Sequence, residues 1–87
     1  MPYYVYILLC NDGSYYTGIA LDVDKRFLAH QNGKGGAYTK THKPLKILYR
    51  EAVGDLSSAL KRELEIKKFS KVQKTSLIRS FKQSEFN

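Results

Sequence analysis

The apolar positions at the start of the chain predict a β-hairpin. Residues 3–10 and 14–20 are rich in Tyr, Val, Ile and Leu, which favour strands, and they flank the polar turn Cys10-Asn11-Asp12-Gly13. The length of this turn decides which side chains share a face, because a slip of one residue moves every side chain to the opposite face.

Two registers of the hairpin make opposite predictions. A two-residue loop, Asp12-Gly13, would place Tyr6 and Tyr16 on opposite faces of the sheet. A three-residue loop that also includes Asn11 would pair Tyr6 with Gly18 and place the two tyrosines on one face. In that register one face carries Tyr4, Tyr6 and Tyr16, and the other carries Val5, Ile7, Leu9 and Ile19. We expect the three-residue loop because it separates phenols from aliphatic side chains.

The remaining pattern predicts three helices and a third strand. A helix over residues 22–32 begins at Asp22 and stops at Asn32-Gly33, and residues 33–44 read as a loop. Residues 45–53 predict a strand, residues 55–69 a helix, and residues 70–81 a helix that starts with a Ser70/Gln73 capping box. The order ββαβαα predicts an α+β fold, with a small three-stranded sheet flanked by helices. We expect one domain over residues 1–82 and a frayed tail at 83–87.

Composition excludes several classes of protein. The longest apolar run, residues 3–10, is shorter than the ~20 residues that span a bilayer, and no signal-peptide pattern opens the chain. The single cysteine, Cys10, cannot form an internal disulfide, and no Cys/His cluster has the spacing of a zinc site. We therefore expect a cytoplasmic protein with no membrane partner.

The charge favours a nucleic-acid partner. Fifteen Lys and Arg against eight Asp and Glu give a net charge of +7, a balance typical of nucleic-acid-binding domains. Net charge can also serve solubility alone. The basic residues, however, concentrate in residues 34–50 and 61–82.

Arg26 and His30 are four residues apart on a predicted helix, so their side chains project from one face about a turn apart. One interpretation is a phosphate clamp beside a proton acceptor. In the other, Arg26 pairs with Asp22 and His30 complements the C-terminus of the helix. The residues alone leave both interpretations open.

Glu63 has an unusual predicted position on the helix over residues 55–69. At about 100° per residue, the apolar positions of this helix form one arc: Leu56, Ala59, Leu60, Leu64 and Ile66. Glu63 falls near the middle of that arc, whereas Glu65 falls on the opposite face. A buried carboxylate without a partner is costly, so we expect Glu63 to face a metal ion or, as the structural alternative, an arginine. Mg²⁺ takes only one or two protein carboxylates, so one glutamate is compatible with one ion.

The loop GKGGAYTKTHKP combines an aromatic ring with basic side chains. We expect five of its residues to contact nucleic acid: Lys34, Tyr38, Lys40, His42 and Lys43. The GKGG sequence lacks the Walker spacing, which excludes a phosphate loop for nucleotide hydrolysis. We assign three other tyrosines to packing: Tyr3, Tyr15 and Tyr49.

Two tripeptides resemble a known signature. Val5-Tyr6-Ile7, then eight residues, then Tyr16-Thr17-Gly18 resembles the paired motifs of the GIY-YIG nuclease superfamily, with Val5 and Thr17 in place of Gly and Ile. The segments CNDGSYYTG, DKRFLAH, GKGGAYTKTHKP and ALKRELEIKKFSKVQK resemble its small single-domain bacterial branch, an uncharacterised group of endonuclease-like proteins. The resemblance covers residues 3–80.

This resemblance implies a fold, an activity and a site. The fold is a three-stranded sheet flanked by helices, and the activity is hydrolysis of nucleic acid, with DNA favoured over RNA, using one Mg²⁺ or Mn²⁺ ion. The residues that match the motif positions are Tyr6, Tyr16, Arg26 and His30 as catalytic residues, Glu63 as the metal ligand, and Gly18 as the glycine that closes the second motif. Two other classes stay open: a non-catalytic nucleic-acid-binding domain on the same scaffold, and a protein-interaction module that docks a partner on its tyrosine face.

Overall fold

The computed structural model describes residues 1–86, with side chains described through residue 82. Strands β1 (Tyr3–Cys10), β2 (Tyr15–Ala20) and β3 (Pro44–Gly54) form an antiparallel sheet of order β2-β1-β3. Helices α1 (Val23–Gln31) and α2 (Ala37–Thr41) precede β3, and α3 (Leu56–Lys67) and α4 (Lys71–Phe86) follow it. The α+β class, the three-stranded sheet and the order ββαβαα are confirmed, with the one-turn α2 as an addition.

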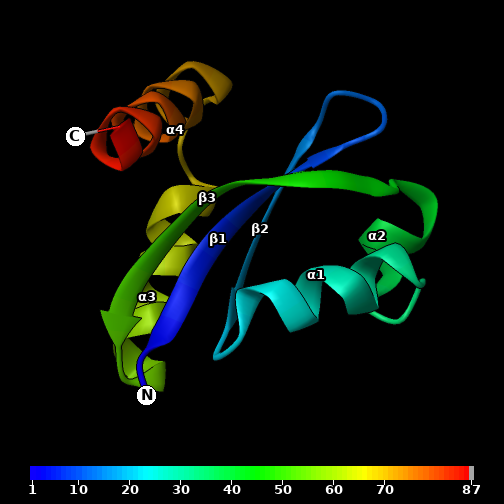
Figure 1. Ribbon diagram of the computed structural model, residues 1–87, viewed down its shortest axis with the longest axis horizontal. Coiled ribbons are helices and arrows are strands. Elements are labelled where there is room, and N and C mark those ends of the chain that lie inside the picture. Colours follow the sequence, from blue (N-terminus) through cyan, green and yellow to red (C-terminus); the bar gives the residue numbers. More distant parts are fainter. Residues whose placement is uncertain (87) are drawn as a thin grey trace.

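The sheet separates two layers of helices (Figure 1). Helix α1 packs on one face, where Val23 and Phe27 meet Tyr6 and Leu8 of β1. Helices α3 and α4 pack on the other face through Ile66 and other apolar side chains. Each face of β1 is therefore buried, which is why this strand reads as a continuous apolar run.

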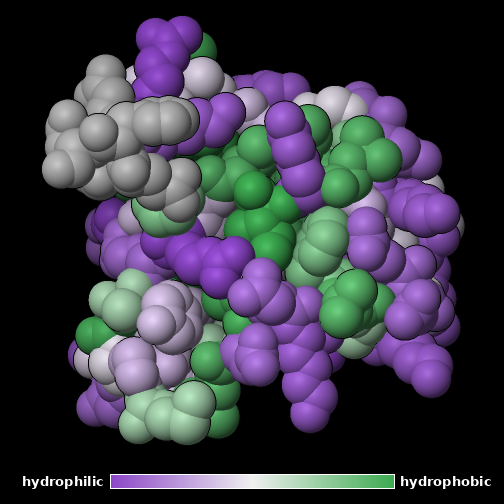
Figure 2. All heavy atoms as spheres, in the orientation of Figure 1, coloured by the Kyte–Doolittle hydropathy of each residue, from purple (hydrophilic) through white to green (hydrophobic). Residues whose placement is uncertain are grey.

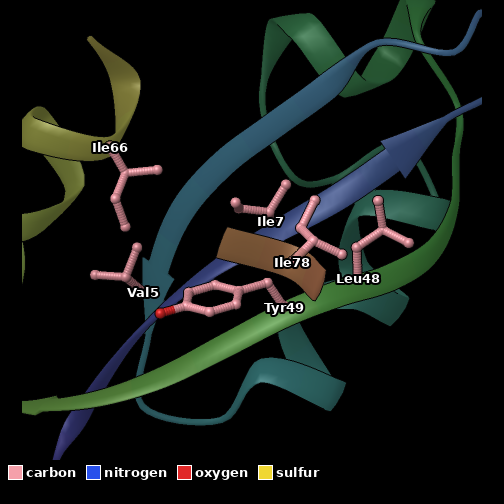
Figure 3. Packing of buried hydrophobic residues seen from close by; sticks show 6 residues of the cluster. All are labelled: Val5, Ile7, Leu48, Tyr49, Ile66 and Ile78. Atoms are coloured by element: carbon pink, nitrogen blue, oxygen red, sulfur yellow. The ribbon is translucent and has the colours of Figure 1, made fainter. Parts of the chain in front are cut away.

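The larger core lies under α3 and α4. Figure 3 shows its buried side chains, which come from β1, β3 and both helices: Val5, Ile7, Leu48, Tyr49, Ile66 and Ile78. The neighbours Leu48 and Tyr49 both reach this core because the pairing with β1 shifts between Ile7 and Leu8, a β-bulge. The bulge accounts for the incomplete alternation of β3.

The three-residue loop of the hairpin is confirmed. Tyr6 pairs with Gly18 and Leu8 with Tyr16, while the backbone N–H of Gly13 donates to the Cys10 carbonyl at 2.9 Å. Gly13 has φ 83°, the left-handed conformation that this loop requires. As expected, the aliphatic side chains of β1 and β2 face α3, and the tyrosine face, formed by Tyr4, Tyr6 and Tyr16, is turned toward α1.

The predicted helix starts are also confirmed. The Asp22 side chain accepts from the backbone N–H of Lys25, and Asp55 accepts from that of Ser58. Ser70 and Gln73 form the reciprocal capping box, with bonds of 2.8 and 3.2 Å. Local hydrogen bonding therefore sets the starts of α1, α3 and α4.

Three expectations about the elements need correction. The segment 33–44 is not a continuous loop, because it contains α2. Helix α3 ends at Lys67, two residues before the expected end, and α4 extends past residue 81 to Phe86. The expected frayed tail at 83–87 stays a prediction; residue 87 lies outside the described residues.

The expected apolar arc of α3 is partly wrong. Its leucines are exposed to 45, 47 and 57%: Leu56, Leu60 and Leu64. The buried stripe is narrower and consists of Ala59 and Ile66, at 0% exposure each. Arg62 lies beside this stripe, where its guanidinium bonds Glu51 of β3, and the leucines of α3 face outward.

No helix among residues 1–86 is long and apolar enough to cross a membrane. On the face drawn in Figure 2, hydrophilic side chains cover much of the surface over α1 and α2.

Candidate active site

The two motif tyrosines lie against a glycine that has no room for a side chain. A Cβ atom on Gly18 would lie 2.6 Å from the Tyr6 hydroxyl oxygen and 3.1 Å from the Tyr16 ring. The phenol of Tyr6 therefore crosses directly over β2 at Gly18, and the two tyrosine rings are 6.4 Å apart between centroids. A residue with a side chain at this position would displace one of the rings.

His30 is fully buried beneath this pair. Its Nε2 lies 2.9 Å from the Tyr6 hydroxyl, and its Nδ1 lies 2.9 Å from the Thr39 hydroxyl. The edge of the imidazole ring meets Tyr16 at 5.0 Å between centroids. The side chain therefore links β1 to α2 and belongs to the tyrosine site. These contacts exclude the interpretation in which His30 only complements the C-terminus of α1.

Arg26 lies one turn before His30 on α1 and faces the same phenol. Its guanidinium donates to the Gly35 carbonyl at 3.3 Å and is close enough to the Tyr6 oxygen to lower the pKa of that phenol. Asp22, the alternative partner, instead caps the helix. The bond to the Gly35 carbonyl is long and therefore weak. The exposed guanidinium can turn from this carbonyl toward an anion with little loss of free energy.

The electrostatics of Tyr6 and His30 are opposed. Burial, followed by the neighbouring Tyr16, raises the pKa of Tyr6 to about 12. Burial and the positive charge of Arg26 lower the pKa of His30. At neutral pH the phenol is therefore protonated and the imidazole neutral, so Tyr6 alone is a poor base and His30 is free to accept its proton.

Glu63 of α3 comes close to the site from the other layer. Its charge contributes to the raised pKa of Tyr6, which places the carboxylate within electrostatic reach of the phenol. The side chain is 18% exposed and pairs with Lys67 at 3.5 Å, whereas the side chain of Glu65 is 59% exposed and bonds Arg62. Among the described side chains, the cation that pairs with Glu63 is therefore Lys67 of its own helix, and not the arginine expected as the structural alternative to a metal ion. The side chain of Lys67 is half exposed.

A metal at this point would have one protein carboxylate. Among the side chains described through residue 82, no group of three or more His, Cys, Asp or Glu residues is placed to hold an ion. Glu63 alone fits Mg²⁺ or Mn²⁺ only in the manner in which such ions use one carboxylate, with water and substrate phosphate as the other ligands.

The loop residues predicted to contact nucleic acid gather beside the hairpin turn. The rings of Tyr38 and His42 stack in parallel at 3.9 Å, and Tyr16 continues the stack at 5.8 Å. The Tyr38 hydroxyl donates to Ser14 at 2.7 Å, which ties α2 to the hairpin. The three lysines of the set are exposed: Lys34, Lys40 and Lys43.

Sequence reasoning missed two residues of this site. Thr39 is 3% exposed and bonds His30, and Gly35 packs so closely that a Cβ atom would lie 1.9 Å from His30 Nδ1. A threonine in a segment without periodicity gives no indication of a contact with the site. The glycines of GKGG do indicate a close approach of the backbone to another group, which is a common reason for glycine.

Replacing Gly18 with alanine is expected to separate Tyr6 from His30. The added methyl would lie 2.6 Å from the Tyr6 oxygen, a distance that forces the phenol to move, so the 2.9 Å contact with Nε2 would be lost. We expect the NMR signals of the His30 ring protons to shift from their wild-type positions, because the ring loses its contact with the buried phenol. The measurement is the NMR spectrum of the histidine rings. Ser80→Ala is the control, because it changes an exposed residue of α4 in the opposite layer. Unchanged His30 signals in Gly18→Ala would contradict the prediction.

Comparisons with known proteins identify the family of the chain. The GIY-YIG catalytic domain family matches residues 2–76. A UPF0213 protein of Staphylococcus saprophyticus is 50% identical over 87% of this chain and 93% of its own, and one of Cupriavidus pinatubonensis is 46% identical over 95% and 92%. The solution NMR structure of a UPF0213 protein from Bacillus halodurans superposes with a TM-score of 0.57 at 40% identity, over 91% of this chain and 84% of that one. The chain therefore belongs to the GIY-YIG catalytic domain family, within its small UPF0213 branch.

Proposed function

We propose that this protein is a metal-dependent phosphodiesterase that hydrolyses nucleic acid, DNA in preference to RNA, in the cytoplasm. The observation that carries the proposal is the contact of two phenols with a buried histidine, Tyr6 and Tyr16 with His30, beside an arginine, Arg26. The charge of Glu63 acts on the same Tyr6 phenol from a fourth element. A plain structural core gives no reason to place three ionisable side chains around a buried phenol, because each charge costs free energy there.

The proposed proton path runs through Tyr6 to His30. A water molecule attacks phosphorus and gives its proton to the Tyr6 oxygen, while Tyr6 gives its own proton to His30 Nε2 at 2.9 Å. This relay removes the need for a free phenolate, which a pKa of about 12 makes scarce at neutral pH. Since the neutral imidazole is the stable form of His30, it is ready to accept.

Access to Tyr6 requires one side chain to move. Tyr6 is 1% exposed, and Arg26 lies beside its hydroxyl while holding the Gly35 carbonyl only at 3.3 Å. A substrate phosphate draws the guanidinium away from that carbonyl, which both uncovers the phenol and places positive charge on the phosphoryl oxygens. Arg26 then stabilises the charge that develops in the transition state, and the half-buried Tyr16 holds the water or phosphate with its hydroxyl.

Glu63 is the proposed metal ligand. When Mg²⁺ or Mn²⁺ is bound there, it supplies Lewis-acid stabilisation of the leaving oxygen. The carboxylate must exchange Lys67 for the ion, a small cost because a half-exposed ion pair contributes less than about 1 kcal/mol.

The basic segment around α2 is the proposed nucleic-acid surface. Lys34, Lys40 and Lys43 provide exposed charge, and the stacked rings of Tyr38 and His42 offer an aromatic surface beside Tyr16. Phosphate contacts of this kind make affinity fall with salt, with a slope of about −0.9 per phosphate neutralised on duplex DNA.

A cleavage assay on Arg26 tests the proposal. Purified protein would be incubated with single-stranded, duplex and branched DNA and with RNA, in Mg²⁺, in Mn²⁺ and in chelator. We expect metal-dependent cleavage by the wild type and a loss of about 10²- to 10³-fold in Arg26→Ala, the usual effect of removing a charge-stabilising donor. The matched control is Arg79→Ala, which removes an exposed arginine of α4 in the opposite layer.

The same assay distinguishes the proposed nuclease from a second candidate, a nucleic-acid-binding domain without catalysis. The deep burial of Tyr6 favours that candidate. Salt-sensitive binding without cleavage of any substrate would support it, and cleavage that survives Arg26→Ala would remove the assigned site.

A further inference from the structure

The chain of polar contacts from Tyr6 does not end at His30. Nδ1 of His30 lies 2.9 Å from the Thr39 hydroxyl, and that hydroxyl donates to the Gly36 carbonyl at 3.4 Å. His30 and Thr39 are 0 and 3% exposed, so water satisfies little of their polar surface. Every hydrogen in this chain therefore needs a protein acceptor.

The carbonyl at the end of the chain favours one direction for the bonds. A carbonyl only accepts, so the Thr39 hydrogen points to Gly36, and the Thr39 oxygen is left to accept from His30. Nδ1 must then carry the ring hydrogen. Nε2 is left without one, and it accepts the hydrogen of the Tyr6 hydroxyl.

The opposite tautomer leaves a buried hydrogen without a partner. If Nε2 carried the hydrogen and donated to Tyr6, the Tyr6 oxygen would receive that bond with Arg26 also facing it. The phenolic hydrogen would then have no acceptor among the described contacts of a residue that is 1% exposed. An unsatisfied buried donor is costly, so the first tautomer is favoured.

The glycine loop holds the ring in this orientation. The Gly35 backbone is so close to Nδ1 that a Cβ atom would lie at 1.9 Å, and its carbonyl receives the Arg26 guanidinium. Gly36 supplies the terminal acceptor. The GKGG sequence, which has no Walker spacing, thus has a different role: its backbone packs against Arg26 and His30 of α1.

We propose that Thr39 is a positioning residue that holds His30 as the Nδ1–H tautomer, with Nε2 unprotonated and directed at the Tyr6 hydroxyl. The proton that leaves the Tyr6 oxygen forms a new N–H bond at Nε2, and the proton of the attacking water replaces it on the phenol. The Nδ1 hydrogen stays on Nδ1, bonded to the Thr39 oxygen. After the leaving oxygen has departed, Nε2 returns its proton to the Tyr6 oxygen, and the proton that this displaces from the phenol passes to water. The consequence for catalysis rests on the proposed function; the tautomer itself does not.

Nitrogen NMR of the histidine rings tests the tautomer without any cleavage assay. Protonated and unprotonated ring nitrogens have well-separated ¹⁵N shifts, and we expect a protonated Nδ1 and an unprotonated Nε2 for His30 in the wild type at neutral pH. A wild-type His30 protonated at Nε2 overturns the proposal whether or not the protein cleaves nucleic acid.

Two variants at position 39 test the role of the hydroxyl. Thr39→Val keeps the shape but leaves Nδ1–H without an acceptor, so we expect the ring hydrogen to move to Nε2 and cleavage to fall by about 10- to 100-fold. Thr39→Ser keeps the hydroxyl, and we expect it to restore the wild-type tautomer and cleavage within about threefold. An unchanged His30 tautomer in a folded Thr39→Val protein overturns the proposal, as does a shifted tautomer in Thr39→Ser. If neither wild type nor variants cleave any substrate while the tautomers behave as expected, the proposed function fails and the tautomer assignment stands.

Discussion

Replacing Tyr6 with phenylalanine is expected to lower the cleavage rate by about 10²- to 10⁴-fold, the range for a group that transfers a proton in the transition state. The ring itself should stay in place, because it is 1% exposed and packs with Leu8 and Val23. The substitution removes only the hydroxyl that contacts His30 Nε2 at 2.9 Å. Single-turnover rates at saturating protein measure this loss apart from substrate binding.

Tyr15→Phe is the matched control for this variant. Tyr15 lies on β2, its ring packs on the opposite face of the sheet, and its hydroxyl contacts Thr75 at 3.3 Å. We expect this variant to cleave within about twofold of the wild type, because its hydroxyl takes part in no proton transfer. Full activity in Tyr6→Phe would exclude the relay and leave Tyr16 as the phenol nearest the substrate.

The pH dependence gives the same experiment a second readout. Only neutral His30 can accept the proton, and burial together with the charge of Arg26 lowers its pKa. The wild-type rate should therefore fall on acidification, with its midpoint below the ordinary histidine pKa of about 6.5. A Tyr6 pKa of about 12 predicts no corresponding loss on the alkaline side up to about pH 10. In Tyr6→Phe the acid limb should disappear, because the residual rate no longer uses His30.

The parts of the fold that sequence reasoning predicted are those with local causes. The register of the hairpin follows from the turn Asn11-Asp12-Gly13 and from the separation of phenols and aliphatic side chains. The starts of α1, α3 and α4 follow from capping side chains that bond backbone N–H groups three residues ahead. These interactions need no knowledge of the rest of the chain, so the sequence alone is sufficient for them.

The parts that it did not predict depend on contacts between distant segments. Helix α2 is one turn long, and no side-chain cap marks its start at Gly36; it is held by contacts such as Thr39 with His30 and Tyr38 with Ser14. The outward position of the leucines on α3 likewise accompanies a distant contact, the ion pair of Arg62 with Glu51 of β3. A helical wheel assumes that leucines lie on the buried side of a helix. On α3, the partly buried Arg62 occupies part of that side.

Glu63 combines a successful and an unsuccessful prediction from the sequence. The wheel placed it in the middle of an apolar arc, and three leucines of that arc turned out to be exposed. The side chain of Glu63 is nevertheless only 18% exposed and near enough to affect Tyr6. Glu63 was predicted to be buried, and its side chain is largely buried, although the predicted apolar arc was too wide.

Replacing Glu63 with glutamine is expected to reduce cleavage by about 10³-fold in saturating Mg²⁺. The change keeps the shape of the side chain and removes the charge that would bind the ion, and Lewis-acid stabilisation of several kcal/mol corresponds to this factor at 1.36 kcal/mol per tenfold. Stability should change little, because the pair with Lys67 at 3.5 Å is partly exposed. Rates measured across a series of Mg²⁺ and Mn²⁺ concentrations give the loss and any shift in metal affinity together.

Glu65→Gln separates the metal site from a general effect of charge. It makes the same change two residues away on α3, where the side chain is 59% exposed and bonds Arg62. Either variant raises the net charge by one, from +7 to +8, so each should bind nucleic acid in chelator as tightly as the wild type or slightly more tightly. Only Glu63→Gln should lose metal-dependent cleavage. Equal losses in the two variants would assign the effect to charge or to Arg62, and an unchanged metal dependence in Glu63→Gln would show that the ion is held elsewhere. A loss confined to Glu63→Gln, with binding intact, would place the ion beside Tyr6 and distinguish a nuclease from a domain that only binds.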